Sequence, residues 1–281
     1  MKTITDIIEM QSLAEAGRMA GMRIALVPTM GYLHKGHLTL MEYGREKADL
    51  LVTSLFVNPL QFGPQEDFEK YPRDPERDAH LAEGAGVDLI FSPEARDLYP
   101  DQFQTYVEVK KVTQNLCGAG RPGHFQGVTT VVCKLFQIVK PHLAVFGQKD
   151  FQQLVAIRQM VRDLNMDLEV VGRPTVRESD GLALSSRNVY LSPEERVSAR
   201  SLSRALQEAL ALYRKGEHRS PTILNRVREI ILGEDRTRID YVKICHPETL
   251  EDIPLITDRG VLALAVRVGK TRLIDNCQLE E

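Results

Sequence analysis

The chain has 281 residues, of which 43% are hydrophobic and 27% are charged, a composition typical of ordinary water-soluble globular proteins. The formal net charge of −3 argues against a nucleic-acid partner, because nucleic-acid-binding proteins carry an excess of lysine and arginine. No apolar run approaches the roughly 20 residues that a membrane-spanning helix needs, so no membrane association is expected. The length allows one large domain or two modest ones.

The four cysteines are widely spaced and form no C-x-x-C pair: Cys117, Cys133, Cys245 and Cys277. This spacing indicates free thiols in a reducing compartment rather than disulfides or metal ligands. Residues 1–6 lack the apolar core of a secretion signal. We therefore expect a cytoplasmic protein.

The chain opens with a predicted helix over 7–20, followed by a short apolar run over 24–27 that is typical of a buried parallel strand. A tight turn follows over 28–37, with the sequence PTMGYLHKGH, and a helix is predicted over 38–45. A helix that begins directly after a strand directs its free N–H groups toward the edge of the sheet. The segment therefore predicts a phosphate-binding site.

Two glycines and two histidines give this turn its chemistry. Gly31 and Gly36 allow the backbone to turn and to approach a ligand closely. His34 and His37 are three residues apart and share one face of a helical turn, where both imidazoles can donate hydrogen bonds to phosphate oxygens. Two alternatives remain open: ordinary surface histidines, or a zinc site, which would need a third ligand from elsewhere in the chain.

A second buried strand is predicted over 48–57, and it ends at Asn58 and Gln61. Ligands collect at the carboxyl ends of strands in open α/β sheets, so these two amides are candidates for ligand contact. The alternative is that Asn58-Pro59 forms only a turn.

The middle of the chain continues the alternation of strands and helices. We predict a loop over 67–75, a helix beginning near 74–76, a strand over 87–91, an edge strand over 105–112, a glycine-rich loop over 118–125 and a buried helix over 126–139. The glycine-rich loop lacks the Lys-Ser/Thr ending of a phosphate loop.

A second strand–turn–helix unit resembles the first. A strand over 142–146 is followed by a glycine turn over 147–150 and a helix over 151–164. Lys149 in this turn would offer a compact positive charge to phosphate, and the alternative is a solvated lysine beside Asp150. A strand over 168–176 then leads into a polar loop over 177–187, whose two serines and Arg187 could clamp a triphosphate.

The composition changes after this loop. Ser192 and Ser220, each followed by proline, open two further predicted helices, and antiparallel strands are predicted over 240–245, 261–268 and 271–275. The sequence thus predicts an α/β fold with a parallel-sheet domain over 1–187 and a smaller C-terminal α+β domain over 188–281.

Five motifs occur in order along the chain. They are VPTMG at 27–31 with HKGH at 34–37, FVNPLQF at 56–62, GQKDFQQ at 147–153 and LSSRN at 184–188. The histidine motif after the first apolar strand resembles that of the nucleotidyltransferase superfamily, and the five together resemble the pantothenate synthetases, the ATP-dependent ligases that join pantoate to β-alanine. The resemblance is strong over 1–190 and looser beyond.

The resemblance implies a Rossmann-like domain with a small C-terminal lid domain, a homodimer, and Mg²⁺ bound with ATP. It also implies two half-reactions, which are formation of pantoyl adenylate with release of pyrophosphate, and attack by the β-alanine amine with release of AMP. Catalytic roles are implied for His37, His34 and Lys149. The implied ATP ligands are Met30, Gly31, Tyr32, Leu33, His34, Lys35, Gly36, His37, Gly147, Gln148, Lys149, Asp150, Val176, Leu184, Ser185, Ser186 and Arg187.

For pantoate the resemblance implies Gln61 and Gln153, and Gln61 is also expected near β-alanine. An amide offers donors and an acceptor without charge, which suits the hydroxyls and carboxylate of pantoate. The geminal methyl groups need an apolar wall, for which Val131, Val132 and Phe146 are candidates. No protein ligand to the metal is predicted.

Three positions depart from the expected family pattern. Gln148 replaces a glutamate, which places an ionic role there in doubt, and Tyr32 and Lys35 replace a small and an acidic residue beside the histidines. Two other functions remain open. One is a nucleotidyltransferase that releases a dinucleotide, and the other is a module that binds ATP without turnover.

Overall fold

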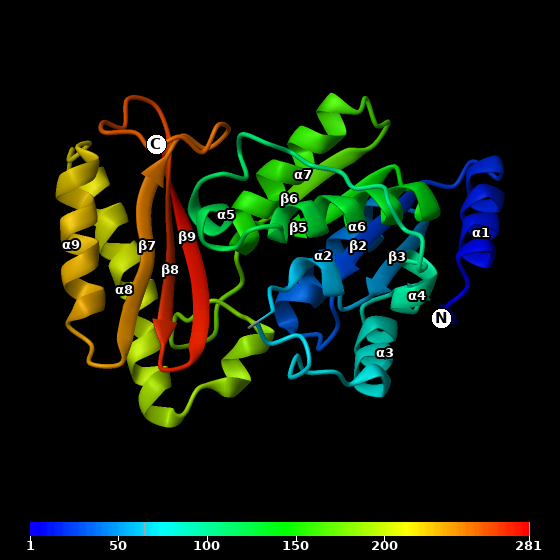
Figure 1. Cartoon of the computed structure of the whole chain (residues 1–281), viewed down its shortest axis with the longest axis horizontal. Helices are drawn as coiled ribbons and strands as arrows, with labels where there is room; N and C mark the ends of the chain where they lie inside the picture. Colours follow the sequence, from blue (N-terminus) through cyan, green and yellow to red (C-terminus); the bar gives the residue numbers. More distant parts are fainter. Residues whose placement is uncertain (65, 281) are drawn as a thin grey trace. The chain divides into compact units, whose positions relative to one another are not determined.

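The computed structural model describes residues 1–64 and 66–280, and Figure 1 shows the course of the chain. The chain divides into two compact units. The first unit comprises Met1–Val109, Arg121–Gln148 and Ala156–Pro174. The second unit comprises Lys110–Gly120, Lys149–Val155 and Thr175–Glu281.

The first unit is built on a six-stranded parallel sheet with the strand order β1-β4-β3-β2-β5-β6. Its strands are β1 (Lys2–Ile4), β2 (Ile24–Thr29), β3 (Leu50–Leu55), β4 (Leu89–Phe91), β5 (Leu143–Gly147) and β6 (Glu169–Arg173). Its helices are α1 (Ile7–Met19), α2 (Lys35–Lys47), η1 (Pro59–Gln61), α3 (Pro75–Gly84), α4 (Ala95–Leu98) and α6 (His124–Val139). Helix α7 (Phe151–Asp163) begins in the second unit and ends in the first.

The central strands β2, β3 and β5 are buried along most of their length, as expected for parallel strands with helices on both faces of the sheet. Ala25 and Val27 of β2 belong to one buried cluster with Met41 of α2. Ile24 and Leu26 alternate with them, so they point to the opposite face, and both are fully buried. Helices α1 and α6 contact each other and β2. This arrangement fixes the carboxyl ends of β2 and β3 at one edge of the sheet.

The second unit contains an antiparallel sheet with the order β7-β8-β9, packed against two long helices (Figure 1). Its elements are α5 (Leu116–Gly120), η3 (Ser186–Tyr190), α8 (Pro193–Arg214), α9 (Ser220–Leu232), β7 (Thr237–Cys245), β8 (Gly260–Val268) and β9 (Thr271–Leu279). Ser192 caps α8 as predicted, because its side chain accepts the N–H of Glu195. The short helix η2 (Gln148–Asp150) follows β5.

The predicted α/β class, with a parallel sheet and a separate antiparallel sheet, is confirmed. The prediction of four free cysteines is also confirmed. In residues 1–64 and 66–280, no helix combines the length and apolar character that a membrane crossing requires. The predicted boundary at 187/188 stays a prediction, because the compact units group 110–120 and 149–155 with the C-terminal part of the chain.

The predicted edge strand over 105–112 is wrong. The N–H of Val107 donates to the hydroxyl of Thr130 at 3.0 Å, and its carbonyl accepts from Thr129 at 2.6 Å. Two hydroxyls of α6 therefore bind the backbone groups of Val107 that a neighbouring strand would otherwise bind. Helix α5 occupies the start of the segment predicted as a glycine-rich loop, and β1 was missed because it contributes only three residues.

Candidate active site

The turn between β2 and α2 is held in a defined conformation by side chains beneath it. Thr29, the last residue of β2, donates its hydroxyl to the carbonyl of Ser54 at 2.7 Å and accepts the N–H of Gly31 at 3.1 Å. Gly31 and Tyr32 both have positive φ angles, +79° and +50°. This left-handed pair reverses the chain and brings it to the start of α2.

The helix begins earlier than predicted, at Lys35 instead of Leu38, so that His34 becomes its N-cap residue. The N–H groups of Lys35 and Gly36 stand in the first turn, where no preceding carbonyl lies in helical register. The positive end of the helix dipole lies at the same place. The sequence-based expectation of a phosphate-type helix start is consistent with this geometry.

The two histidines stack, with ring centroids 4.0 Å apart and an interplanar angle of 21°. The backbone N–H of His34 donates to Nδ1 of His37 at 3.3 Å. In the neutral ring of His37 the proton therefore resides on Nε2, the atom remote from the backbone. Both side chains are partly exposed. That the Nε2–H group of His37 donates to a ligand at the start of α2 stays a prediction.

A carboxylate that the sequence analysis did not single out lies beneath this turn. Asp78 of α3 is 2% exposed and accepts the N–H groups of Tyr32 and Leu33, both at 2.6 Å. No local sequence signal marks this contact, because 46 residues separate Asp78 from Tyr32.

Gln61 lies in η1, after the carboxyl end of β3, and its side-chain amide is held on both sides. Asn58 donates to its Oε1 at 3.2 Å, and its Nε2 donates to the sulfur of Met30 at 2.9 Å. Asn58 also donates to the carbonyl of Gly127 and accepts from Tyr99. The prediction that Asn58 and Gln61 lie at the end of a strand is confirmed, and the amide of Gln61 comes close to the turn that carries the histidines.

The backbone carbonyl of Gln61 is fixed by a charged network that was not predicted. His124 at the start of α6 lies 2.8 Å from this carbonyl through Nδ1, and Arg121 donates to it at 3.2 Å. Arg121 also forms two 2.6 Å hydrogen bonds with Glu66. Burial raises the pKa of Glu66, but the hydrogen bonds and charge of Arg121 outweigh it, and the net pKa lies below its ordinary value.

The ring of His124 has a defined protonation pattern in this network. Its Nε2 lies 2.9 Å from Nη1 of Arg121, which can only donate. Nε2 is then the acceptor, so Nδ1 carries the proton and donates to the Gln61 carbonyl. The network therefore holds the Gln61 carbonyl through an imidazole beside an ion pair.

The three predicted apolar residues all lie in the first unit and are buried. Val131 and Val132 are on α6 and Phe146 is on β5, with exposures of 6%, 4% and 4%. Their burial matches an apolar wall, and a pantoate contact by them stays a prediction.

Apart from Gln153, the predicted site residues of the second unit form two local groups. Lys149 and Asp150 lie in η2, with Nζ of Lys149 3.5 Å from the carboxylate of Asp150. Asn276 of β9 donates its side-chain amide to the carbonyl of Lys149 at 2.9 Å. The backbone around Lys149 is thereby attached to the antiparallel sheet.

The second group is a small hairpin followed by η3. The N–H of Leu184 donates to the carbonyl of Val176 at 3.0 Å, so two predicted ATP ligands are paired across the hairpin. Ser185 caps η3 by accepting the N–H of Arg187 at 3.3 Å. Ser186 is 7% exposed, and Arg187 is partly exposed.

Charged residues that were not predicted secure this hairpin. Arg177 forms hydrogen bonds with both oxygens of Asp275 at 2.6 and 3.0 Å, and Arg196 of α8 binds Glu178 and Asp180 at 2.6 and 2.9 Å. Their partners are far away in sequence or lie on another element, so sequence patterns alone could not identify them.

Two neighbouring glutamines on α7 have different environments. Gln152 is 5% exposed, accepts the N–H of Cys117 at 2.9 Å and donates to the carbonyls of Val112 and Asn115. Its amide is fully used in holding the segment before α5. Gln153, the predicted pantoate ligand, is the next residue and is partly exposed.

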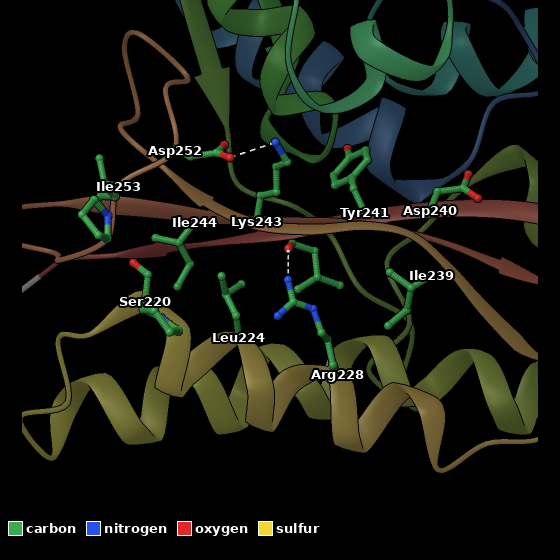
Figure 2. A pocket seen from close by; sticks show the side chains of 13 residues that line it. Ser220, Leu224, Arg228, Ile239, Asp240, Tyr241, Lys243, Ile244, Asp252 and Ile253 are labelled. Atoms are coloured by element: carbon green, nitrogen blue, oxygen red, sulfur yellow. Dashed lines mark hydrogen bonds and ion pairs between the residues drawn. The ribbon is translucent and has the colours of Figure 1, made fainter.

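The second unit also contains a hollow of about 580 Å³ between α9 and β7. Figure 2 shows its lining, in which Lys243 points toward Asp252 and Arg228 reaches the backbone of β7. These contacts measure 2.9 Å, from Nζ of Lys243 to the carboxylate, and 3.2 Å, from Arg228 to the carbonyl of Val242. Among the described residues, none of the predicted site residues lines this hollow. We therefore place the candidate active site at the histidine turn.

In the part of the chain that the structure describes, no group of three or more His, Cys, Asp or Glu side chains is arranged to hold a metal ion. The zinc interpretation of His34 and His37 thus lacks a third ligand there. Asp78 is close to the turn, but both of its oxygens already accept backbone N–H groups. Mg²⁺ held mainly by phosphates and water needs no such cluster, so this arrangement is compatible with it.

The predicted residues fall into both units. The first unit contains residues 30–37, Gly147, Gln148, Gln61 and the three apolar residues, and the second contains Lys149, Asp150, Gln153, Val176 and residues 184–187. The comparisons with known proteins concern the chain as a whole. A family model described as pantoate-beta-alanine ligase matches residues 2–278.

Two curated relatives match over nearly the whole chain, and both are named pantothenate synthetase. The one from Syntrophus aciditrophicus (strain SB) is 59% identical over 276 residues, covering 98% of this chain and 96% of the relative. The one from Geotalea uraniireducens (strain Rf4) is 58% identical over 281 residues, covering 100% of both.

Solved structures agree with the sequence comparison. The pantothenate synthetase of Thermus thermophilus matches with a TM-score of 0.95 and 47% identity, covering 100% of both chains. The pantoate-beta-alanine ligase of Francisella tularensis, described as complexed with beta-gamma ATP and beta-alanine, matches with a TM-score of 0.82 and 31% identity, covering 100% of this chain and 98% of that one. The chain therefore belongs to the pantoate–β-alanine ligase family.

Proposed function

We propose that this protein forms pantothenate from pantoate and β-alanine at the expense of ATP, through pantoyl adenylate. Family membership supports the overall reaction, and the ATP and β-alanine named for the Francisella tularensis relative support those two substrates. The observation that best supports the mechanism is the geometry of the two histidines at the start of α2. There Nδ1 of His37 accepts the His34 N–H, so the proton of the neutral ring is on Nε2.

In the first half-reaction a carboxylate oxygen of pantoate attacks the α-phosphorus of ATP, and the bond to the β-phosphate oxygen breaks as pyrophosphate leaves. Negative charge grows on the phosphate oxygens during this step. The Nε2–H of His37, the imidazole of His34, and the N–H groups of Lys35 and Gly36 are the fixed donors that would stabilise it. In the second unit, Lys149, Ser185, Ser186 and Arg187 are proposed as further phosphate ligands, with Asp150, Val176 and Leu184 as other ATP contacts.

Pantoate is proposed to bind the amide of Gln61, with Gln153 as a second amide ligand. The carbonyl and amide of Gln61 are both held by neighbours, so its orientation is set before a ligand arrives. Val131, Val132 and Phe146 are proposed to supply the apolar surface for the methyl groups. A preset amide loses little freedom on binding, which favours affinity.

In the second half-reaction the neutral amine of β-alanine attacks the acyl carbon of pantoyl adenylate. The carbon–nitrogen bond forms, the bond to the phosphate oxygen breaks, AMP leaves, and the nitrogen loses a proton. We propose that Gln61 lies near β-alanine. Because AMP is already a good leaving group, positioning of the two reactants should dominate this step.

Mg²⁺ is proposed as the metal that accompanies ATP. When bound it would neutralise phosphate charge while keeping most of its waters. No protein ligand is assigned to it. We further propose a cytoplasmic homodimer, which rests on the family resemblance alone. A monomer mass by light scattering at micromolar concentration would contradict the dimer.

The test is product analysis with substrates omitted one at a time. AMP and pyrophosphate should form only when ATP, Mg²⁺ and pantoate are all present, and β-alanine should be required for turnover. ATP–pyrophosphate exchange that depends on pantoate would exclude a module that only binds ATP. Formation of ADP and phosphate would refute the adenylate route, and release of a dinucleotide would favour a nucleotidyltransferase.

A further inference from the structure

The buried carboxylate of Asp78 holds the backbone of the turn between β2 and α2. This residue lies on α3 (Pro75–Gly84) and is 2% exposed. Its Oδ2 lies 2.6 Å from the N–H nitrogen of Tyr32, and its Oδ1 lies 2.6 Å from that of Leu33. Each oxygen thus accepts one of two consecutive N–H groups, directly before the N-cap of α2.

The turn needs such a partner because its conformation is unfavourable on its own. Tyr32 has a φ of +50°, a region that residues with side chains rarely adopt. Gly31 precedes it with a φ of +79°, and a Cβ added there would meet Oδ2 of Asp78 at 3.0 Å. The N–H groups of Tyr32 and Leu33 would lose hydrogen bonds if the carboxylate were absent.

The charge of Asp78 is itself partly compensated. Burial raises the pKa of Asp78 above its ordinary value, while the N–H groups of Leu33 and Tyr32 and the nearby charge of Arg77 oppose that effect. Arg77 lies 3.7 Å from the carboxylate and 5.2 Å from the centre of the Tyr32 ring. The Arg77 guanidinium therefore lies near both Asp78 and Tyr32, the residue whose N–H group Asp78 accepts.

We propose that Asp78 is a positioning residue for adenylation, which fixes the turn over 31–33 and thereby the orientation of His34 and His37. This inference rests on the proposed role of the two histidines as phosphate donors. The carboxylate directs the N–H groups of Tyr32 and Leu33 away from any ligand. Phosphate is then left to the first N–H groups of α2 and to the imidazoles, and Asp78 itself touches no reacting atom.

The direct test is Asp78→Asn, which keeps the shape of the side chain but sets an NH₂ group against one of the two N–H groups. The pantoate-dependent rate of AMP formation should fall about 10- to 100-fold, the scale of a misplacement near 1 Å. The KM for ATP should change less than about threefold, since the Asp78 oxygens do not contact it. Pantothenate formation from preformed pantoyl adenylate should stay near the parent rate, which also shows that the variant is folded.

The matched control is Asp74→Ala on the same helix. Asp74 caps α3 by accepting the N–H of Arg77 at 3.2 Å, so its loss should lower thermal stability without changing the turn. A fall in the adenylation rate for Asp78→Asn no larger than that for Asp74→Ala would overturn the inference. Equal damage to both half-reactions would overturn it as well.

Gly31→Ala perturbs the same contact from the other side, because its Cβ would meet Oδ2 of Asp78 at 3.0 Å, and it should also slow adenylation, so the inference does not depend on one variant. His37→Ala separates this inference from the function on which it rests. If His37→Ala leaves adenylation intact, the histidine role itself is wrong. If His37→Ala slows adenylation while Asp78→Asn does not, only the role of Asp78 is wrong.

Discussion

Gly127 of α6 is the position where one added methyl group should do the most damage to the first unit. A Cβ built there would lie 2.3 Å from the carbonyl oxygen of Leu60, 2.5 Å from its carbon and 2.8 Å from the backbone nitrogen of Gln61. These are backbone atoms, so η1 must move away from α6. Overpacking of this kind costs about 1–3 kcal/mol.

The sign of the effect makes Gly127→Ala informative. In the interior of a helix, alanine is favoured over glycine by about 0.5–1 kcal/mol, so a variant without a clash would be more stable than the parent. Gly84, the last residue of α3, provides a comparison without a clash, because nothing lies within 4 Å of its added Cβ. We expect Gly127→Ala to lower the melting temperature by about 2–12 °C, from about 2–4 °C for each kcal/mol. Gly84→Ala should leave it unchanged or slightly raised.

The displacement of η1 in Gly127→Ala should also move Gln61, the proposed pantoate-binding residue. Gln61 follows Leu60 directly, and Asn58 holds both the Gln61 side chain and the Gly127 carbonyl. The KM for pantoate should therefore rise in Gly127→Ala while the KM for ATP changes little. The measurements are thermal denaturation and steady-state kinetics in each substrate. Unchanged stability together with an unchanged KM for pantoate would refute the reasoning.

Three further predictions concern single side chains. Gln61→Ala should weaken pantoate by about 1–3 kcal/mol, since polar groups of the ligand lose their partner, and equal losses for pantoate and ATP in steady-state kinetics would contradict the assignment. His37→Ala and Lys149→Ala should each slow adenylation about 10²-fold or more but use preformed pantoyl adenylate almost normally; single-turnover rates that fall equally in both steps would mean that these residues hold AMP throughout. For Glu66, burial raises the pKa, but Arg121 outweighs burial and lowers the net pKa below its ordinary value. The ion pair therefore stabilises the folded protein at pH values above the ordinary carboxyl pKa. This stabilisation is lost as the pH falls through the lower pKa of the folded state. The difference in urea midpoint between the parent and Glu66→Gln should therefore be full at pH 7 and shrink below about pH 4.5, and a difference that grows on acidification would contradict the role of the pair.

The elements that the sequence predicted well are those with a strong local pattern. The apolar runs of β2, β3 and β5 and the Ser-Pro start of α8 carry enough information in a few adjacent residues. The segment over 105–112 failed because weak alternation resembles an edge strand, while its hydrogen-bond partners, Thr129 and Thr130, lie about twenty residues away. A segment whose backbone is bound by the hydroxyls of a helix carries no periodic sequence pattern that would reveal those partners.

The same limit applies to the candidate site. His34, His37 and Gln61 were chosen as candidates because each lies in a motif that directly follows a predicted strand. Asp78, His124 and the Arg121–Glu66 pair act on those residues through contacts between distant segments. Aspartate in an amphipathic helix ordinarily faces solvent, so only the packing of α3 beside the turn identifies Asp78 as buried.

The strand order of the parallel sheet also bears on how the chain folds. Lys2 of β1 pairs with Leu89 of β4, and Ala25 of β2 pairs with Leu143 of β5. Both pairings close long loops, and the loop-closure entropy is lost before the strand contacts offset it. During synthesis β2 must wait for the whole segment up to β5 before its second neighbour exists. A chain of this topology should therefore fold slowly and expose apolar strands for a time, which makes refolding yield sensitive to protein concentration.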